Sequence, residues 1–345
     1  MSALRTALIA VAIAAAAAAA AQGRRPRGPQ PDWQKDWDKA LEEARERKVP
    51  LLVVIPKRQG SGGPIYYPKQ LSDKTVYALT QNFVCLIADD ARFPEIEKRI
   101  AVEYHKGKFG MYGQKLQFVF CKPDGTELED CHLAGDISVA ELTRTMQKVL
   151  RMYPKAISRT KFLKCRSLRA RAEIYRKELI FSKAIELYRD LAKEKVDLEM
   201  VKEAEDMPEK LLQELKEKLA ETEKLASGGA DDKREAVRRL VALKVGCERE
   251  RELKEYYEKA KSLLDGLKTD PDVSPTARKA NMWERALKQY LKAEERFHKG
   301  DLKKALSAYK KILKNYRDTD YADRAKQRMK EIELRLQKER EQKGK

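Results

Sequence analysis

The alternation of apolar and polar residues divides the chain into a first part that contains strands and a second part that is helical throughout. Two short apolar runs, LLVVI at 51–55 and FVCLIAD at 83–89, predict strands that are covered on both faces. The segment 116–135 predicts a hairpin, because a Pro-Asp-Gly turn sequence at 123–125 separates its two strand-like runs. These strands predict a sheet in the first part of the chain.

Helices are predicted where apolar residues recur at steps of three and four. In the first part these segments run from Asp32 to Pro50 and over 71–82, 93–104 and 137–150. Asp32 and Ser138 are the expected N-caps, and Pro50 is expected to end the first helix. The predicted order of elements is therefore α-β-α-β-α-β-β-α.

The second part contains two stretches, 168–194 and 289–316, that resemble each other at an offset of 121 residues. The corresponding residues are Ala172 and Ala293, Ala184 and Ala305, Ile185 and Leu306, and Tyr188 and Tyr309. The segment 317–332 predicts one more helix. Residues 207–268 predict helices without a clean repeat, which are expected to break at 227–229 and at Gly266.

The first part resembles the thioredoxin fold of exported bacterial proteins, both in its order of elements and in two motifs. The motif residues are Trp33, Trp37, Ala40, Leu41, Ala44 and Pro50 of the entry helix, and FVFCKPDG at 118–125. The resemblance implies an α/β thioredoxin-like domain over 32–152. It also implies a C-x-x-C motif after the first central strand, whose first cysteine is activated at a helix N-terminus.

The positions of that motif are occupied here by Gly60-Ser61-Gly62-Gly63, so the turn carries no sulfur. The family's cis-proline corresponds to Leu116, where a trans peptide bond is expected. The resemblance therefore implies a degenerate active site without thiol-disulfide exchange. Together with Lys57 and Arg58, the glycines form either a permissive surface loop or an anion-binding site.

The segment 289–332 resembles a tetratricopeptide helix pair and the helix that follows it. The residues that carry this resemblance are Ala293, Phe297, Gly300, Asp301, Leu302, Ala305 and Tyr309. Together with the weaker likeness over 168–194, it implies an all-α helical repeat region over 153–335. A loose helical bundle or a coiled-coil arm is the alternative, and residues 336–345 are expected to be a flexible tail.

The first 23 residues have the pattern of an export signal. Arg5 supplies the positive start, and an apolar run from Ala7 to Ala21 ends in small residues that suit cleavage. We expect removal of residues 1–23, a short leader at 24–31, and a location in the periplasm or cell envelope. The alternative is an uncleaved N-terminal segment that contacts the membrane.

The formal net charge of +19 is concentrated in the second part of the chain. Residues 151–345 contain 52 lysines and arginines against 37 acidic residues, whereas residues 24–150 contain 21 against 18. The densest stretch, 151–172, has eight basic residues and no acidic one. This stretch either attracts anions or forms a solvated helix face.

The cysteines and histidines do not predict a metal site or a cofactor site. Cys85, Cys121, Cys131, Cys165 and Cys247 include no C-x-x-C pair, and the three histidines are scattered. We expect the cysteines to be buried thiols that behave as small apolar residues.

These features favour a non-catalytic thioredoxin-fold adaptor of the cell envelope over an enzyme. The adaptor is expected to bind a protein partner through the first helix of each repeat pair, at Arg169, Arg176, Gln289, Lys292 and Arg296. Because these residues are basic on balance, an acidic partner segment is favoured. One alternative is a thiol-disulfide oxidoreductase or redox chaperone that uses Cys121 and Cys131. Binding of nucleic acid or anionic lipid is a third hypothesis, against which the lack of aromatic residues among the basic ones argues.

Overall fold

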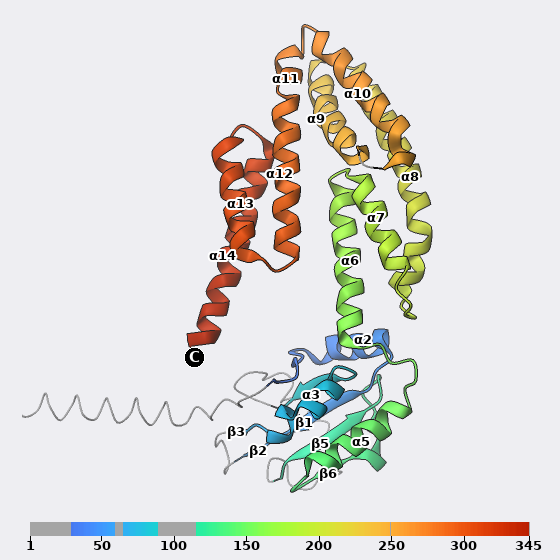
Figure 1. The fold of residues 1–345 in the computed structure, drawn as a ribbon, viewed down its shortest axis with the longest axis vertical. Coiled ribbons are helices and arrows are strands. Elements are labelled where there is room, and N and C mark those ends of the chain that lie inside the picture. The colour runs from blue at the N-terminus through green and yellow to red at the C-terminus, as the bar shows by residue number, and fades with distance from the viewer. Residues whose placement is uncertain (1–28, 59–64, 89–114, 249, 345) are drawn as a thin grey trace, which may run out of the picture. The chain divides into compact units, whose positions relative to one another are not determined.

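The structure is a computed structural model, and it describes residues 29–58, 65–88, 115–248 and 250–344. The chain divides into two compact units between Leu163 and Lys164, within helix α6 (Arg159–Lys177). Figure 1 shows that the first unit contains the strands and that the second consists of helices. This arrangement confirms the predicted α/β part followed by a helical part.

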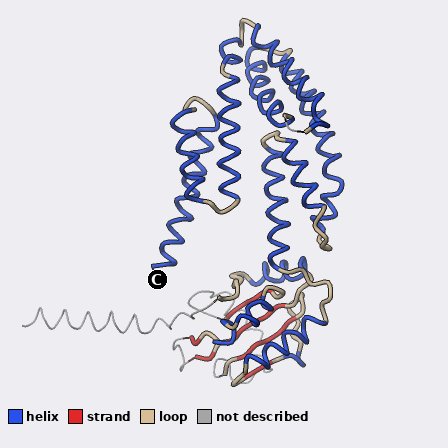
Figure 2. The backbone as a smooth tube through the Cα atoms, in the orientation of Figure 1, coloured by secondary structure: helices blue, strands red, loops and turns tan. Residues whose placement is uncertain are grey.

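A four-stranded mixed sheet lies at the centre of the first unit (Figure 2). Its strands are β1 (Leu51–Ile55), β4 (Val84–Ile87), β5 (Gln117–Cys121) and β6 (Leu133–Ala134), in the order β4-β1-β5-β6. Strand β1 is parallel to β4, with Leu51 opposite Val84, and antiparallel to β5, with Leu51 opposite Cys121. Every residue of these three strands is buried, which confirms the prediction of strands covered on both faces.

Short helices and a small ribbon accompany this sheet. They are α2 (Trp37–Arg47), η1 (Lys69–Ser72), α3 (Lys74–Thr80), η2 (Glu129–Cys131), α5 (Val139–Arg151) and the paired strands β2 (Lys57–Arg58) and β3 (Ile65–Tyr66). The helix predicted over 93–104 lies outside the described residues.

One predicted N-cap is confirmed and the other is wrong. The Ser138 hydroxyl caps α5 by accepting a hydrogen bond of 3.1 Å from the Glu141 amide. Helix α2 is capped by Asp36 and not by Asp32, whose carboxylate forms an ion pair with Arg159. The helix begins late because Trp33 is held in an extended bridge beside Cys85 of β4.

A fully buried arginine, Arg47 at the end of α2, connects several backbone segments of the first unit. Its guanidinium donates hydrogen bonds to the carbonyl oxygens of Gln81 at 2.6 Å, Ile157 at 3.1 Å and Phe83 at 3.3 Å. It also forms an ion pair of 2.7 Å with Glu43. These partners compensate the desolvation of a buried cation, which would otherwise be strongly destabilising.

The second unit is a succession of helices that pack in pairs (Figure 1). After α6 come α7 (Phe181–Ala192), α8 (Glu199–Ala226), α9 (Ala230–Cys247), η3 (Arg251–Leu253), α10 (Lys254–Thr269), α11 (Ser274–Arg278), α12 (Ala280–His298), α13 (Leu302–Asn315) and α14 (Asp320–Gly344). The break at 227–229 is confirmed. Gly266 lies inside α10 and does not break it, and α14 continues to Gly344 through the predicted flexible tail.

The turns of the two similar helix pairs share an unusual backbone conformation. Leu179 between α6 and α7 has φ 61°, and Gly300 between α12 and α13 has φ 81°. The two residues are 121 positions apart, so the left-handed turn belongs to the repeated pattern. The first turn also lies against α9, where a Cβ on Gly246 would be 2.0 Å from the carbonyl oxygen of Leu179. Glycine is therefore required at position 246.

Candidate binding pocket in the helical unit

A pocket of about 460 Å³ lies within the helical unit, bordered by α6, α7, α9 and α12. Its buried floor is formed by Tyr175 of α6, Ile180 of the following turn, Ser182 of α7 and Val245 of α9. Half-buried Leu291 of α12 adds apolar surface to the wall. Residues from both repeat-like helix pairs therefore meet at one concave site.

Five charged residues form the rim of this pocket, and we call them the rim residues. They are Lys183, Glu248, Lys288, Lys292 and Glu295. Lys288 bridges Glu248 at 2.7 Å and Glu284 at 2.8 Å, and Lys299 neutralises Glu295 at 2.8 Å. Both carboxylates of the rim are thus already paired.

Three polar groups of the pocket have no side-chain partner among the described residues. The hydroxyls of Tyr175 and Ser182 and the ammonium of Lys292 form no hydrogen bond or ion pair there. Ser182 is only 3% exposed, whereas Lys292 is exposed at the rim. The pocket therefore offers two hydroxyl groups at its floor, those of Tyr175 and Ser182, and one uncompensated cation at its mouth.

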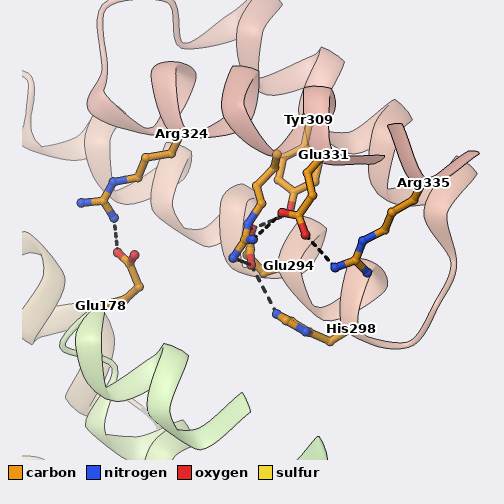
Figure 3. Close-up of polar contacts among 8 residues, drawn as sticks. Glu178, Glu294, His298, Tyr309, Arg324, Glu331 and Arg335 are labelled. Atoms are coloured by element: carbon orange, nitrogen blue, oxygen red, sulfur yellow. Dashed lines mark hydrogen bonds and ion pairs between the residues drawn. The ribbon is translucent and has the colours of Figure 1, made fainter. Parts of the chain in front are cut away.

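Glu294 of α12 directly precedes the rim residue Glu295 and is the centre of a buried network of polar contacts. This network joins α12, α13 and α14 (Figure 3). Glu294 is 2% exposed and accepts a hydrogen bond of 2.5 Å from the Tyr309 hydroxyl. The Arg328 guanidinium donates to both of its oxygens, at 3.0 and 3.2 Å. The Nε2 atom of His298 lies 3.4 Å from Glu294, without suitable hydrogen-bond geometry. The network holds the three helices together.

The environment of Glu294 determines its ionisation. Burial alone would raise the pKa of this carboxyl group, but His298, Tyr309 and Arg328 together hold the pKa at about 2. Burial and the hydrogen bond to Glu294 raise the pKa of Tyr309 in turn. Glu294 is therefore ionised and Tyr309 is neutral at physiological pH, as expected of a structural ion pair.

The first helix pair contains the same carboxylate–tyrosine contact. The Tyr188 hydroxyl donates a hydrogen bond to Glu173, and both residues lie 121 positions before Tyr309 and Glu294. The sequence comparison matched the two tyrosines but missed the two glutamates, which the same offset would have revealed. The repeated contact shows that the two helix pairs share a side-chain connection as well as a backbone turn.

The residues predicted to bind a partner fall in different environments. Lys292 lies at the rim of the pocket, and Gln289 and Arg296 are exposed on the same helix. Arg169 and Arg176 instead form ion pairs with α8, to Glu203 at 2.8 Å and to Glu214 at 2.6 Å. The pocket residues Tyr175, Ile180 and Leu291 were not predicted, because apolar residues at helical spacing are usually core residues, and no motif in the sequence distinguished Ser182.

The positions of the degenerate thioredoxin motif are described only in part. Gly60-Ser61-Gly62-Gly63 lies outside the described residues, and so does any geometry of an anion site there. Lys57 is exposed in β2 opposite Tyr66, and Arg58 is the next residue of the same strand. Leu116 directly precedes β5, and no peptide bond among the described residues is cis.

All five cysteine side chains are buried thiols. Burial raises the pKa of Cys85 and of Cys247 to about 12. Because the thiolate is the nucleophile in disulfide exchange, these groups are unreactive at neutral pH.

Comparison with family models, with curated proteins and with solved structures finds no match for this chain. Within the described part of the chain, no cluster of histidine, cysteine, aspartate and glutamate side chains is suited to hold a metal ion. None of the helices in that part has the length and the apolar character that a bilayer crossing requires.

Proposed function

We propose that the protein is a non-catalytic adaptor of the cell envelope, which binds a segment of a protein partner in the pocket of its helical unit. The observation that carries this proposal is the pocket's combination of a buried apolar floor, formed by Tyr175, Ile180 and Val245, with a charged rim. Ligand sites typically join apolar walls to a few polar groups in this way. Helical arrays offer grooves of this kind to extended or helical peptides.

The first unit is proposed to be a thioredoxin-like domain that has lost its active site. The parallel pair β1–β4 beside the antiparallel pair β5–β6, followed by α5, supports this assignment. The glycines at 60–63 support the loss of redox chemistry. The export-signal pattern of residues 1–23 supports the location in the envelope.

The redox alternative is disfavoured by the state of the cysteines. Cys121 and Cys131 are both buried, and the raised pKa of Cys85 and of Cys247 removes two further candidates for a nucleophile. Reduction of insulin disulfides with dithiothreitol as the electron source would test this point. Turnover that is lost in Cys121→Ser would overturn the non-catalytic assignment.

Site-specific photo-crosslinking in the source cells tests the adaptor function. Benzoylphenylalanine placed at Lys292 is expected to form a discrete adduct with one protein, which mass spectrometry identifies. Placed at Lys303, an exposed position of α13 that does not line the pocket, it is expected to form none. The partner, once purified, should bind the unmodified protein reversibly and should lose affinity for Leu291→Asp. Identical adducts from both positions, or no adduct from position 292, would refute the proposal.

A further inference from the structure

We infer that the pocket recognises a short peptide motif in which a bulky apolar side chain is directly followed or preceded by an acidic residue. This inference rests on the proposed function, since it specifies the segment that the adaptor binds. Three features of the pocket carry it: the shape and polarity of its floor, the unpaired hydroxyl of Ser182 and the uncompensated charge of Lys292.

The floor accounts for the apolar residue of the motif. Tyr175, Ile180 and Val245 are each at most 8% exposed, and Leu291 continues the apolar surface along α12. A volume of about 460 Å³ lies within the range of roughly 300–1,000 Å³ that is usual for ligand pockets. A phenylalanine or leucine side chain can therefore be removed from water there, which is the main source of affinity in such sites.

The hydroxyl of Ser182 offers a hydrogen bond to a polar atom of the bound peptide. It forms none with the described residues, and its oxygen is not among the fully buried atoms that lack a partner, so it is accessible within the pocket. A hydroxyl can either donate to a carbonyl or accept from an amide, so it suits both directions of the peptide.

The charges of the rim account for the acidic residue. Glu248 is paired with Lys288 and Glu295 with Lys299, whereas Lys183 is paired with Glu186 on its own helix. The remaining charge is that of Lys292. An acidic side chain next to the anchor would neutralise it, whereas a basic side chain would be repelled.

A second cation strengthens this preference. The Nε atom of Arg171 is buried and has no hydrogen-bond partner. The pKa of Glu295 is lowered first by its hydrogen bond from Lys299 and further by the charges of Arg171 and Lys183. Arg171 therefore lies near the pocket, and its positive potential adds to that of Lys292.

The inference is tested on the full-length protein with fluorescein-labelled peptides in an anisotropy titration. The probes are Gly-Ser-Glu-Phe-Gly-Ser and Gly-Ser-Phe-Glu-Gly-Ser, which place the acidic residue on either side of the anchor. Each is compared with one peptide that carries glutamine for glutamate and one that carries alanine for phenylalanine. We expect the alanine peptide to lose binding and the glutamine peptide to bind about two- to fivefold more weakly, as for an exposed ion pair. Lys292→Gln should lower the affinity for the acidic probe by the same factor and should leave the affinity for the glutamine peptide unchanged.

Two further variants provide the controls. Ser182→Ala should lower the affinity for both the acidic and the neutral peptides by about two- to tenfold, which is the usual effect of losing one hydrogen bond. Lys303→Gln makes the same charge change as Lys292→Gln at an exposed position on α13 and should have no effect.

The motif would be overturned if Lys292→Gln and Lys303→Gln lost affinity equally. It would also be overturned if the glutamate and glutamine peptides bound with equal affinity. If no probe binds while the crosslink from position 292 still identifies a reversible partner, the motif is wrong and the adaptor function stands. If both experiments fail, the proposed function fails with it.

Discussion

The buried carboxylate of Glu294 provides the most direct test of how the helical unit is stabilised. Glu294→Gln keeps the size of the side chain and removes its charge. Arg328, which donates two hydrogen bonds to this carboxylate, then loses the more deeply buried of its two anionic partners and keeps only Glu331. The Tyr309 hydroxyl keeps an oxygen to donate to, so the variant removes mainly the ionic part of the network.

The magnitude follows from the ionisation of Glu294. Its pKa is about 2 in the folded protein, against an ordinary value of 4.5. Because one pKa unit corresponds to about 1.4 kcal/mol, ionised Glu294 contributes about 3 kcal/mol to the free energy of unfolding at neutral pH. A pKa that is lowered in the folded state gives stability above pH 4.5, which is lost as the pH falls towards 2. Near pH 2.5 the remaining contribution is about 1 kcal/mol.

Urea unfolding followed by circular dichroism at 222 nm measures this contribution at pH 7 and at pH 2.5. Because the chain has two units, hydrogen exchange at the amides of α12, α13 and α14 assigns the effect to the region around Glu294. Glu331→Gln is the matched control, since Glu331 also pairs with Arg328 but is 36% exposed. We expect the control substitution to lower the free energy of unfolding by less than about 1 kcal/mol. A loss in Glu294→Gln that is the same at both pH values would refute the electrostatic argument.

Other substitutions test packing and reactivity. Gly246→Ala should destabilise the helical unit by about 3 kcal/mol or more in urea unfolding, because the new methyl group would overlap the Leu179 carbonyl. Gly266→Ala should instead stabilise it by about 0.5–1 kcal/mol, since Gly266 lies within α10 with open space beside it. Arg47→Met should lower the stability of the α/β unit by about 3–5 kcal/mol, because it removes the ion pair with Glu43 and leaves three carbonyl oxygens without their donor. The five buried thiols should react slowly with Ellman's reagent in the native protein and quickly in urea, and a thiol that reacts quickly in the native protein would contradict the non-catalytic assignment.

The elements that were predicted correctly are those that local chemistry determines. The apolar run at 51–55 is strand β1 from its first residue to its last, and Ser138 caps α5 as expected. Asp32 and Asp36 are equally good caps by sequence, but the pairing of Trp33 with Cys85 keeps the chain extended and leaves the role to Asp36. Tertiary packing also keeps Gly266 inside a helix, at a local cost of about 1 kcal/mol.

The pocket was predictable only at Lys292. Its floor joins Tyr175 and Ile180 to Val245 and Leu291, residues up to 116 positions apart that are brought together by helix packing. Periodicity identifies a residue as facing inward, but it does not distinguish a filled core from a cavity. The ion pairs that engage Arg176 with α8 are equally invisible in the sequence, because they depend on which helices become neighbours.

The two repeated helix pairs share their connections but differ where the pocket lies. Both pairs have a glutamate–tyrosine hydrogen bond and a left-handed turn at corresponding positions. At the offset of 121, however, Tyr175 corresponds to Arg296 and Ser182 to Lys303, and both of these counterparts are charged and exposed. The second pair therefore cannot form a floor of the kind that the first pair provides. The proposed binding thus depends on residues in which the pairs have diverged, while the residues that they share maintain the scaffold.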